Sequence, residues 1–141
     1  MCRIDAGLFQ AKEMKTVRRI YGDQGEEAAI RFLVREGYHL LERNWRVGHL
    51  EVDIIAEQFG TLVFVEVKTR SDEHWQTAAE SVDHKKQGNI LKAARAYSLI
   101  HDTHYPMRFD IITVVGNEPP YRITHFPDAF SAESYARVER Y

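Results

Sequence analysis

Two carboxylates and a lysine stand out because each interrupts a segment that is otherwise apolar. Asp53 lies inside the run LEVDIIA at residues 50–56, and Glu66 and Lys68 lie in the run LVFVEVK at residues 62–68. Carboxylate oxygens are ligands that Mg²⁺ and Mn²⁺ prefer, and the Val67 carbonyl could add a third oxygen. An ammonium group beside them can orient a water or stabilise charge that grows on phosphorus. The three side chains predict a divalent metal site suited to phosphodiester hydrolysis, with Lys68 as a catalytic group.

The two runs flank residues 58–61, whose composition favours a turn, so we expect a β-hairpin. A turn centred on residues 59–60 sets Asp53 opposite Glu66 and Glu51 opposite Lys68. Two carboxylates opposed at about 5 Å repel each other. Packing alone gives no reason for that pairing, whereas a bound cation does.

Side chains alternate between the two faces of a strand, so one face of the hairpin is expected to be apolar throughout. Its members are Val52, Ile54, Ala56, Val63, Val65 and Val67. The other face is apolar near the turn and charged at its far end. The alternative interpretation is a cross-strand salt bridge between Glu51 and Lys68, beside two exposed carboxylates. A loop of odd length would make Asp53 and Glu66 diagonal neighbours, which a metal can still bridge.

The surrounding elements follow from hydrophobic periodicity and turn residues. Helices are expected over residues 24–36 and 82–99, and Gly37 fits the left-handed residue that ends the first. Strands are expected over residues 38–46, 50–56, 62–67, 107–115 and 121–126. Residues 71–77 are polar and loop-like. The order αβββαββ predicts an α/β domain with a mixed, mostly antiparallel sheet flanked by helices.

Length and composition limit the number of domains and the classes of protein that fit this sequence. The chain has 141 residues and a formal net charge of −2, which suits one globular domain, expected over residues 22–130. Residues 1–21 are predicted to be a flexible basic segment, and residues 131–141 a C-terminal tail. The single Cys2 excludes an intramolecular disulfide and a cysteine-based zinc site. The sequence contains neither an 18-residue apolar run nor a signal-peptide pattern, so a cytoplasmic protein without membrane segments is expected.

Several motifs together resemble a known family. An Asp followed by Glu-x-Lys on the next strand resembles the PD-(D/E)XK nucleases of the restriction-endonuclease-like fold, although Val52 stands where that label has Pro. The resemblance is closer to the bacterial YraN family and runs from about Gly22 to Phe130. The motifs that carry it are GDQGEEAA at 22–29, RNWR at 43–46, EVDIIA at 51–56, FVEVKTR at 64–70, Lys85, and RFD at 108–110.

The resemblance implies a restriction-endonuclease-like domain over residues 22–130 and a metal-dependent endonuclease that uses Mg²⁺ or Mn²⁺ and no small-molecule cofactor. It implies that Glu26, in the first turn of the first helix, approaches the metal as a ligand or as a neighbour of the ligands. Archaeal Holliday-junction resolvases share this arrangement, which favours DNA, branched DNA included, as the substrate. A carboxylate favoured at that position by the helix dipole is the alternative for Glu26.

Basic side chains are candidates for contacts with a phosphate backbone, which position a nucleic acid without reading its sequence. They are Arg43, Arg46, Arg70, Lys85, Lys86 and Arg108. For each, a solvated surface charge is the alternative, and Arg108 could instead pair with Asp110 on the same strand face. Trp45 and Trp75 could stack on bases, although a half-buried role is favoured. Seven histidines are too scattered to predict a zinc site.

The sequence therefore predicts a nuclease that acts on nucleic acid at Asp53, Glu66, Lys68 and Glu26. Two alternatives stay open: a non-catalytic module that binds nucleic acid or a protein on the same fold, and a structural subunit of a larger complex. A homodimer would suit an enzyme that cuts junctions, because it holds two sites at fixed spacing, but the sequence carries no interface signature.

Overall fold

The computed structural model describes residues 23–71 and 82–139, so the basic segment 1–21 and Trp75 lie outside the described residues. A helix over residues 23–35 opens the described chain. It is followed by β1 (His39–Val47), β2 (Leu50–Gln58), β3 (Thr61–Arg70), α2 (His84–Ile100), β4 (Met107–Val115), β5 (Arg122–Phe130) and α3 (Ala132–Glu139). The predicted order αβββαββ is confirmed, and α3 extends it.

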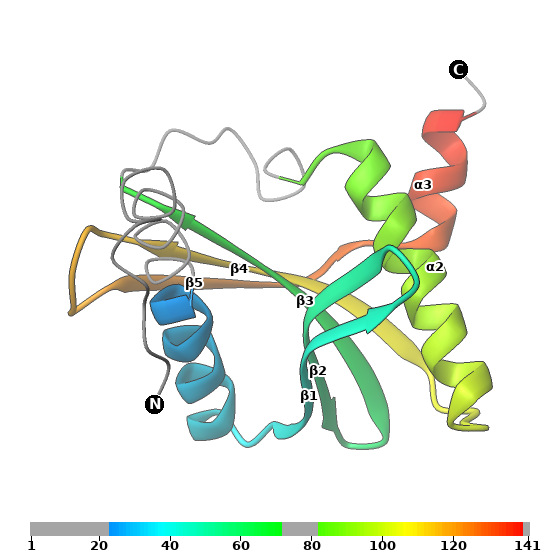
Figure 1. Cartoon of the computed structure of the whole chain (residues 1–141), viewed down its shortest axis with the longest axis horizontal. Helices are drawn as coiled ribbons and strands as arrows, with labels where there is room; N and C mark the ends of the chain where they lie inside the picture. The colour runs from blue at the N-terminus through cyan, green and yellow to red at the C-terminus, as the bar shows by residue number, and fades with distance from the viewer. Residues whose placement is uncertain (1–22, 72–81, 140–141) are drawn as a thin grey trace, which may run out of the picture.

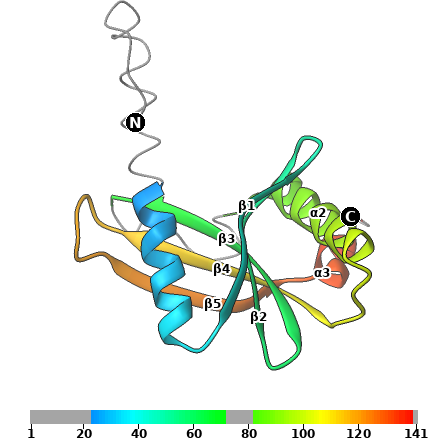
Figure 2. The ribbon, with the colours of Figure 1, turned by 60° about the horizontal axis from the view of Figure 1, so that its bottom comes forward.

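The five strands form one sheet in the order β1-β2-β3-β4-β5. The β3–β4 pair is parallel and the other three pairs are antiparallel, as the predicted mixed, mostly antiparallel sheet requires. The helix over residues 23–35 covers one face of this sheet, while α2 and α3 lie on the other side (Figures 1 and 2). The molecule has the α/β, restriction-endonuclease-like architecture that the sequence predicted.

The β2–β3 hairpin has the predicted register, and it opens into a fork. The paired residues run from Gln58 with Thr61 to Ile54 with Val65. On the N-terminal side of Ile54, β2 pairs with β1 and not with β3 within the described residues; Val52 there lies opposite Trp45. The β1–β2 ribbon turns out of the plane of β3–β5 toward α2 (Figure 2). Asp53 lies at the point where β2 and β3 separate.

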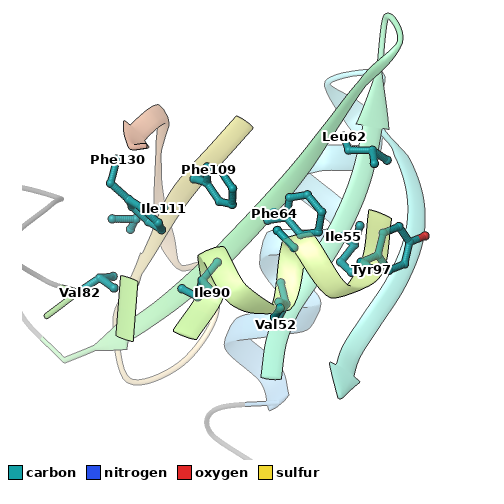
Figure 3. Close-up of a cluster of buried hydrophobic side chains, with 12 residues drawn as sticks. Val52, Ile55, Leu62, Phe64, Val82, Ile90, Tyr97, Phe109, Ile111 and Phe130 are labelled. Atoms are coloured by element: carbon teal, nitrogen blue, oxygen red, sulfur yellow. The ribbon is translucent and has the colours of Figure 1, made fainter. Parts of the chain in front are cut away.

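Each face of the sheet has its own apolar core. One core packs Ala29, Ile30 and Leu33 of the first helix on Ile54, Ala56, Val63, Val65, Ile112 and Val114. The other packs α2 on the opposite face and contains Val52, Ile55, Phe64 and Phe109 (Figure 3). Our prediction that Val52 shares a face with Ile54 is wrong, because Val52 packs in the α2 core, toward which the β1–β2 ribbon turns after it leaves β3.

The first helix ends as its sequence indicates. Gly37 has φ +89°, its N–H donates to the Val34 carbonyl, and the Tyr38 N–H donates to the Leu33 carbonyl. This is the Schellman pattern that glycine permits. Because the helix ends at this point, the chain can turn and enter β1 directly.

The C-terminal segment differs from the expected tail, because residues 132–139 form α3. Tyr135 explains its position: its ring stacks on His84 at 4.0 Å, and it packs where Gly88 of α2 has no side chain. Ser131 accepts a hydrogen bond from the Ser134 N–H at 3.1 Å, as a helix N-cap does. These contacts place α3 against the first turns of α2.

Candidate metal centre

Asp53 and Glu66 face each other across the fork between β2 and β3. The Val67 N–H donates a 2.8 Å hydrogen bond to Oδ2 of Asp53, so the Asp53 carboxylate replaces a main-chain partner where the ladder ends. The neighbouring Glu66 side chain is buried and points to the α2 side of β3. The two carboxyl groups are close enough to share a hydrogen bond when one is protonated. The predicted convergence of these two acids is therefore present.

Glu26 joins the pair from the first helix. The preceding residue, Gly25, is buried, and a Cβ there would overlap the Thr69 hydroxyl of β3, so glycine allows the helix to approach the strand. Glu26 is close enough to Asp53 for their negative charges to interact, and Asn44 of β1 hydrogen bonds to it. Glu26 thus lies near Asp53, and its role beside a metal stays a prediction.

Two lysines approach the same oxygen of Glu66 from different elements. Lys68 Nζ and Lys86 Nζ each lie 3.9 Å from Oε1 of Glu66. Lys86 is in the first turn of α2, which Asp83 caps by accepting a 2.7 Å hydrogen bond from the Lys86 N–H. Cations are unfavourable at a helix N-terminus, so lysines in this turn suit a site that receives negative charge.

Burial raises the pKa of all three acids, and the charge of Asp53 adds to the shift of Glu66 and Glu26. Burial, followed by the charge of Asp53, raises the pKa of Glu66 to about 8. Burial and then Asp53 raise the pKa of Glu26 to about 7. Burial also raises the pKa of Asp53, although the Val67 N–H opposes that shift. Without a cation, the cluster therefore retains protons at neutral pH.

Two buried oxygens of the cluster have no hydrogen-bond donor within the described residues: Oε2 of Glu26 and Oε2 of Glu66. Buried polar atoms usually have a partner, so each orphaned acceptor calls for an explanation. A hard divalent cation would satisfy both and offset the repulsion, so the residues fit such an ion. Within residues 23–71 and 82–139, no three acidic, His or Cys side chains already converge as a complete ligand set. Asp53, Glu66 and Glu26 are therefore the candidates for such a site among the described residues.

The predicted basic residues divide into two groups. Arg43 binds Glu27 at 3.0 Å and its charge reaches Glu26, while Arg46 lies 3.6 Å from Glu51, whose charge reaches Asp53. Arg70 ends β3 and Lys85 precedes Lys86, and both are exposed. Arg43 and Arg46 are thus linked to acids of the fork, whereas a place for Arg70 and Lys85 at its rim stays a prediction. Glu51 pairs with Arg46, so the alternative Glu51–Lys68 salt bridge is not the arrangement found.

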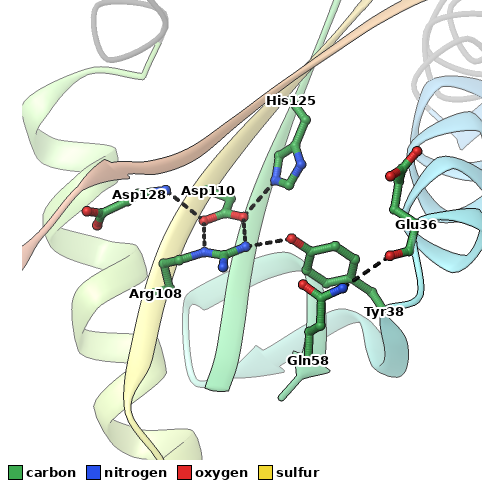
Figure 4. Close-up of polar contacts among 7 residues, drawn as sticks. All are labelled: Glu36, Tyr38, Gln58, Arg108, Asp110, His125 and Asp128. Atoms are coloured by element: carbon green, nitrogen blue, oxygen red, sulfur yellow. Dashed lines mark hydrogen bonds and ion pairs between the residues drawn. The ribbon is translucent and has the colours of Figure 1, made fainter. Parts of the chain in front are cut away.

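Arg108, also predicted as a phosphate contact, belongs to a separate network (Figure 4). Its Nε and NH2 atoms donate to both oxygens of Asp110 at 2.9 and 2.7 Å, and NH2 also donates to the Tyr38 hydroxyl. His125 and the Asp128 N–H complete the shell around Asp110, which is 0% exposed. Burial alone would raise the pKa of Asp110, but the hydrogen bonds led by Arg108 lower it. Arg108 is therefore a structural partner of Asp110, the alternative that the sequence had left open.

Sequence reasoning underrated two residues at the site. Lys86 was predicted only as a phosphate contact, yet it contacts Glu66 directly. Asn44 enters the sequence prediction only within the RNWR motif at 43–46, but it has φ +51° on an edge strand and hydrogen bonds to Glu26. The position of Lys86 at the start of a predicted helix was the one sequence feature that could have indicated its place in the site. Trp45 is half-buried against Tyr97, with 5.2 Å between ring centroids.

A groove of about 770 Å³ lies away from the carboxylate pair, over the outer side of the first helix and the β4–β5 turn. Its apolar lining includes Ile30, Val34, Pro119 and Ile123. Neither Asp53 nor Glu66 lines it. None of the described helices is both long enough and apolar enough to cross a membrane.

Comparison with known proteins places this site inside a shared sequence. The model of the family described as "Uncharacterised protein family UPF0102" matches residues 25–114, which include Glu26, Asp53, Glu66, Lys68 and Lys86. A UPF0102 protein of Bacteroides thetaiotaomicron is 45% identical over 109 residues, which cover 77% of this chain and 90% of the relative. One from Myxococcus xanthus is 43% identical over 116 residues (82% and 92%), and one from Persephonella marina is 42% identical over 115 residues (81% and 96%). The chain belongs to the UPF0102 family.

Proposed function

We propose that this protein is a metal-dependent nuclease that hydrolyses phosphodiester bonds, with DNA as its substrate. The observation that carries the proposal is the buried Asp53–Glu66 pair, whose charges repel and whose orphaned Glu66 oxygen lacks a donor. Such an arrangement costs stability unless a cation binds it. Burial of two mutually repelling acids at a strand fork is a feature of sites built for a ligand rather than for packing.

Asp53 and Glu66 would hold Mg²⁺ or Mn²⁺, with Glu26 close enough to bind a water of the ion's shell. When bound, the ion supplies Lewis-acid stabilisation of the charge that develops on the phosphate. The Val67 N–H fixes the orientation of the Asp53 carboxylate at 2.8 Å, so this ligand does not need to reorganise. Asn44 holds Glu26 toward the pair.

Lys68 and Lys86 would act on the reacting groups. In the structure, both ammonium groups lie 3.9 Å from Oε1 of Glu66, a distance that leaves their donor hydrogens available for a phosphate oxygen or a water. A fixed ammonium beside the phosphate stabilises the developing negative charge. Lys68 would orient the attacking water, and Lys86 would bind a non-bridging phosphate oxygen from the α2 side.

The basic residues at the rim would position the substrate. Arg43 and Arg46 lie on β1, Arg70 ends β3 and Lys85 is in the first turn of α2. We expect these charges to bind a phosphate backbone, which the acidic pair alone would repel. Contacts of this kind carry no sequence information, so cleavage is expected to depend on salt and on DNA shape more than on base sequence.

A non-catalytic module that binds nucleic acid on the same fold is the second candidate. The observation in its favour is that the described residues contain no ready set of three metal-ligating side chains. Such a module would bind DNA equally well with EDTA and with Mg²⁺. It would also tolerate loss of Lys68, because a group that orients water has no role in binding alone.

The test is a cleavage assay of the full chain on linear duplex, single-stranded and four-way-junction DNA and on RNA, with Mg²⁺, Mn²⁺ or EDTA. We expect metal-dependent cleavage of DNA that falls by about 10² or more in Asp53→Asn and Glu66→Gln. Glu118→Gln, which removes an exposed carboxylate in the β4–β5 turn, is the matched control. Cleavage that survives both fork substitutions would refute the site, and DNA binding without cleavage on every substrate would favour the second candidate.

A further inference from the structure

One aromatic side chain of α3 packs along the first turn of α2. The ring of Tyr135 stacks on the ring of His84, with 4.0 Å between the centroids and 8° between the planes. It also covers Gly88, where an added Cβ would lie only 2.7–2.9 Å from three atoms of the tyrosine side chain. His84 and Gly88 are one helical turn apart, so Tyr135 spans the first turn of α2.

Lys86 lies between these two residues in the sequence but on the other side of the helix. With 3.6 residues per turn, it is roughly 160° around the axis from both His84 and Gly88. It lies instead one turn before Ile90, which is buried in the core between α2 and the sheet. Lys86 therefore points toward the sheet, where its Nζ is 3.9 Å from Oε1 of Glu66. The first turn of α2 is enclosed between Glu66 and the ring from α3.

This turn has little other packing to hold it in place. Val82 before it and Ile90 after it are buried in the core, whereas residues 83–87 are all exposed or half-buried. The first turn of a helix also lacks part of the internal hydrogen bonding, which makes it easy to displace. Asp83 caps the Lys86 N–H at 2.7 Å, but a cap within the turn does not set its distance from the sheet. Tyr135 supplies a contact that does.

The support is itself fixed where α3 begins. Phe130, which precedes the helix, is buried and stacks on Phe109 of β4 with 5.4 Å between the centroids. The Ser131 N–H donates to Oγ of Ser134 at 2.8 Å, and the Ser134 N–H donates to Oγ of Ser131 at 3.1 Å, which is a reciprocal cap. Tyr135 follows this cap directly, and α3 lies beside α2 (Figures 1 and 2).

We propose that Tyr135 is a positioning residue, which supports the first turn of α2 and so holds the ammonium group of Lys86 beside Glu66. Without the ring, the turn would move away from the sheet, and the ammonium group, which is already partly exposed, would turn to water. Tyr135 lies beyond residues 25–114, so the support comes from a part of the chain that the family model does not match. Its consequence for cleavage rests on the proposed function, whereas the contact itself does not.

A double-mutant cycle in the metal-free protein tests the proposal. Urea melts in EDTA at pH 8.5 of the wild type, Lys86→Gln, Glu66→Gln and the double variant give the coupling energy between these two side chains. The four proteins are then measured again with Tyr135→Ala added. We expect a favourable coupling that falls by at least about half without the ring. A general loss of stability cancels from the cycle, so a merely structural role of α3 would leave the coupling unchanged.

Three further variants, measured in the same cycle, separate the ring from the rest of α3. Val138→Ala, on an exposed part of the same helix, is the matched control and should leave the coupling unchanged. Tyr135→Phe keeps the ring and should also keep the coupling. His84→Ala removes the other ring of the stack, so it should weaken the coupling, and it serves as the test if Tyr135→Ala does not fold.

Three results would overturn the proposal. They are a wild type without favourable coupling between Lys86 and Glu66, a coupling that both Tyr135→Ala and His84→Ala leave intact, and an equal loss in Val138→Ala. The melts contain neither metal nor DNA, so a protein that cleaves nothing would leave this result standing. Failure of the inference is therefore distinct from failure of the nuclease proposal.

Discussion

The Val67 N–H donates its hydrogen bond to the side chain of Asp53, not to a main-chain carbonyl of β2. This 2.8 Å contact marks the residue at which β2 leaves β3. It also fixes the Asp53 carboxylate beside Glu66, whose other neighbours are two lysines. The fork therefore holds an acidic pair in which Asp53 satisfies the sheet's backbone, whereas nothing in the sheet requires Glu66 beside it.

Neutralising one member of the pair should stabilise the metal-free protein. Glu66→Gln removes a repelling, buried charge, and Lys68 and Lys86 are partly exposed and can turn to water. We expect the free energy of unfolding in EDTA at pH 8.5 to be unchanged or to rise by about 1–3 kcal/mol. The stabilisation that Mg²⁺ gives the wild type should disappear in the variant. Urea melts with EDTA and with Mg²⁺ measure both, and a loss of about 3–5 kcal/mol in EDTA would show a structural ion pair instead.

Metal-free stability should fall as the pH rises. The pKa of Glu66 is about 8 in the folded protein and 4.5 as its ordinary value, so in this window the folded state holds a proton that the unfolded state has released. Stability then decreases with pH from about 5 to about 8.5. Urea melts in EDTA at several pH values measure the slope, with Glu66→Gln as the control that flattens it. A wild-type slope of the opposite sign would contradict the burial of unpaired acids.

Metal affinity, unlike metal-free stability, should increase as the pH rises. Mg²⁺ or Mn²⁺ displaces the protons that the carboxylates retain at neutral pH, so the apparent affinity should rise from pH 6 to pH 8.5 with release of protons. Isothermal titration calorimetry in buffers of different ionisation enthalpy counts those protons. Binding that is independent of pH and releases no protons would place the ion elsewhere.

Lys86 should matter for cleavage and its neighbour Lys85 much less. Lys86 lies 3.9 Å from Glu66, whereas Lys85 is exposed on the adjacent position of the same turn. We expect Lys86→Gln to lower the cleavage rate at saturating DNA by about 10²-fold and Lys85→Gln to weaken DNA binding with little change in that rate. Single-turnover assays separate the two effects. Equal losses in both variants would make Lys86 one more backbone contact.

Gly25→Ala should move Glu26 away from the fork. The added Cβ would overlap the Thr69 hydroxyl, so the first turn of the helix must shift. We expect lower metal affinity and a loss of stability of about 1–3 kcal/mol. Thr69→Ala removes the overlapping atoms, so the double variant should recover much of both, as thermal melts and calorimetry can show. A single variant with full stability and affinity would mean that the close approach is unimportant.

Much of the fold could be predicted because its signals are local. The β2–β3 register followed from the turn at residues 58–61, and the end of the first helix followed from Gly37. The packing of Val52 in the α2 core could not be predicted, because strand alternation assumes a sheet that stays continuous and β2 leaves β3 at Asp53. The helix α3 was missed because its stabilising contact, Tyr135 on Gly88, is a tertiary one.

The acidic residues of the candidate site could be predicted from the sequence, whereas its lysines and arginines were harder to predict. Asp53 and Glu66 stand out inside apolar runs, whereas a lysine on a helix has no local mark that separates a catalytic group from a solvated one. Arg108 shows the same difficulty, because only the structure reveals that Asp110 and Tyr38 occupy its guanidinium group. The partners of long charged side chains depend on how elements pack, which sequence patterns do not encode.

The most direct test of the central claim is a crystal structure of the protein soaked in Mn²⁺, with data collected for anomalous scattering. The account predicts one strong anomalous peak within ligand distance of both Asp53 and Glu66, about 2.0–2.3 Å from their oxygens. The same soak of Glu66→Gln should lose the peak. A wild-type map without density in the fork, or with manganese bound only at other acids, would contradict the claim that this pair is a metal site.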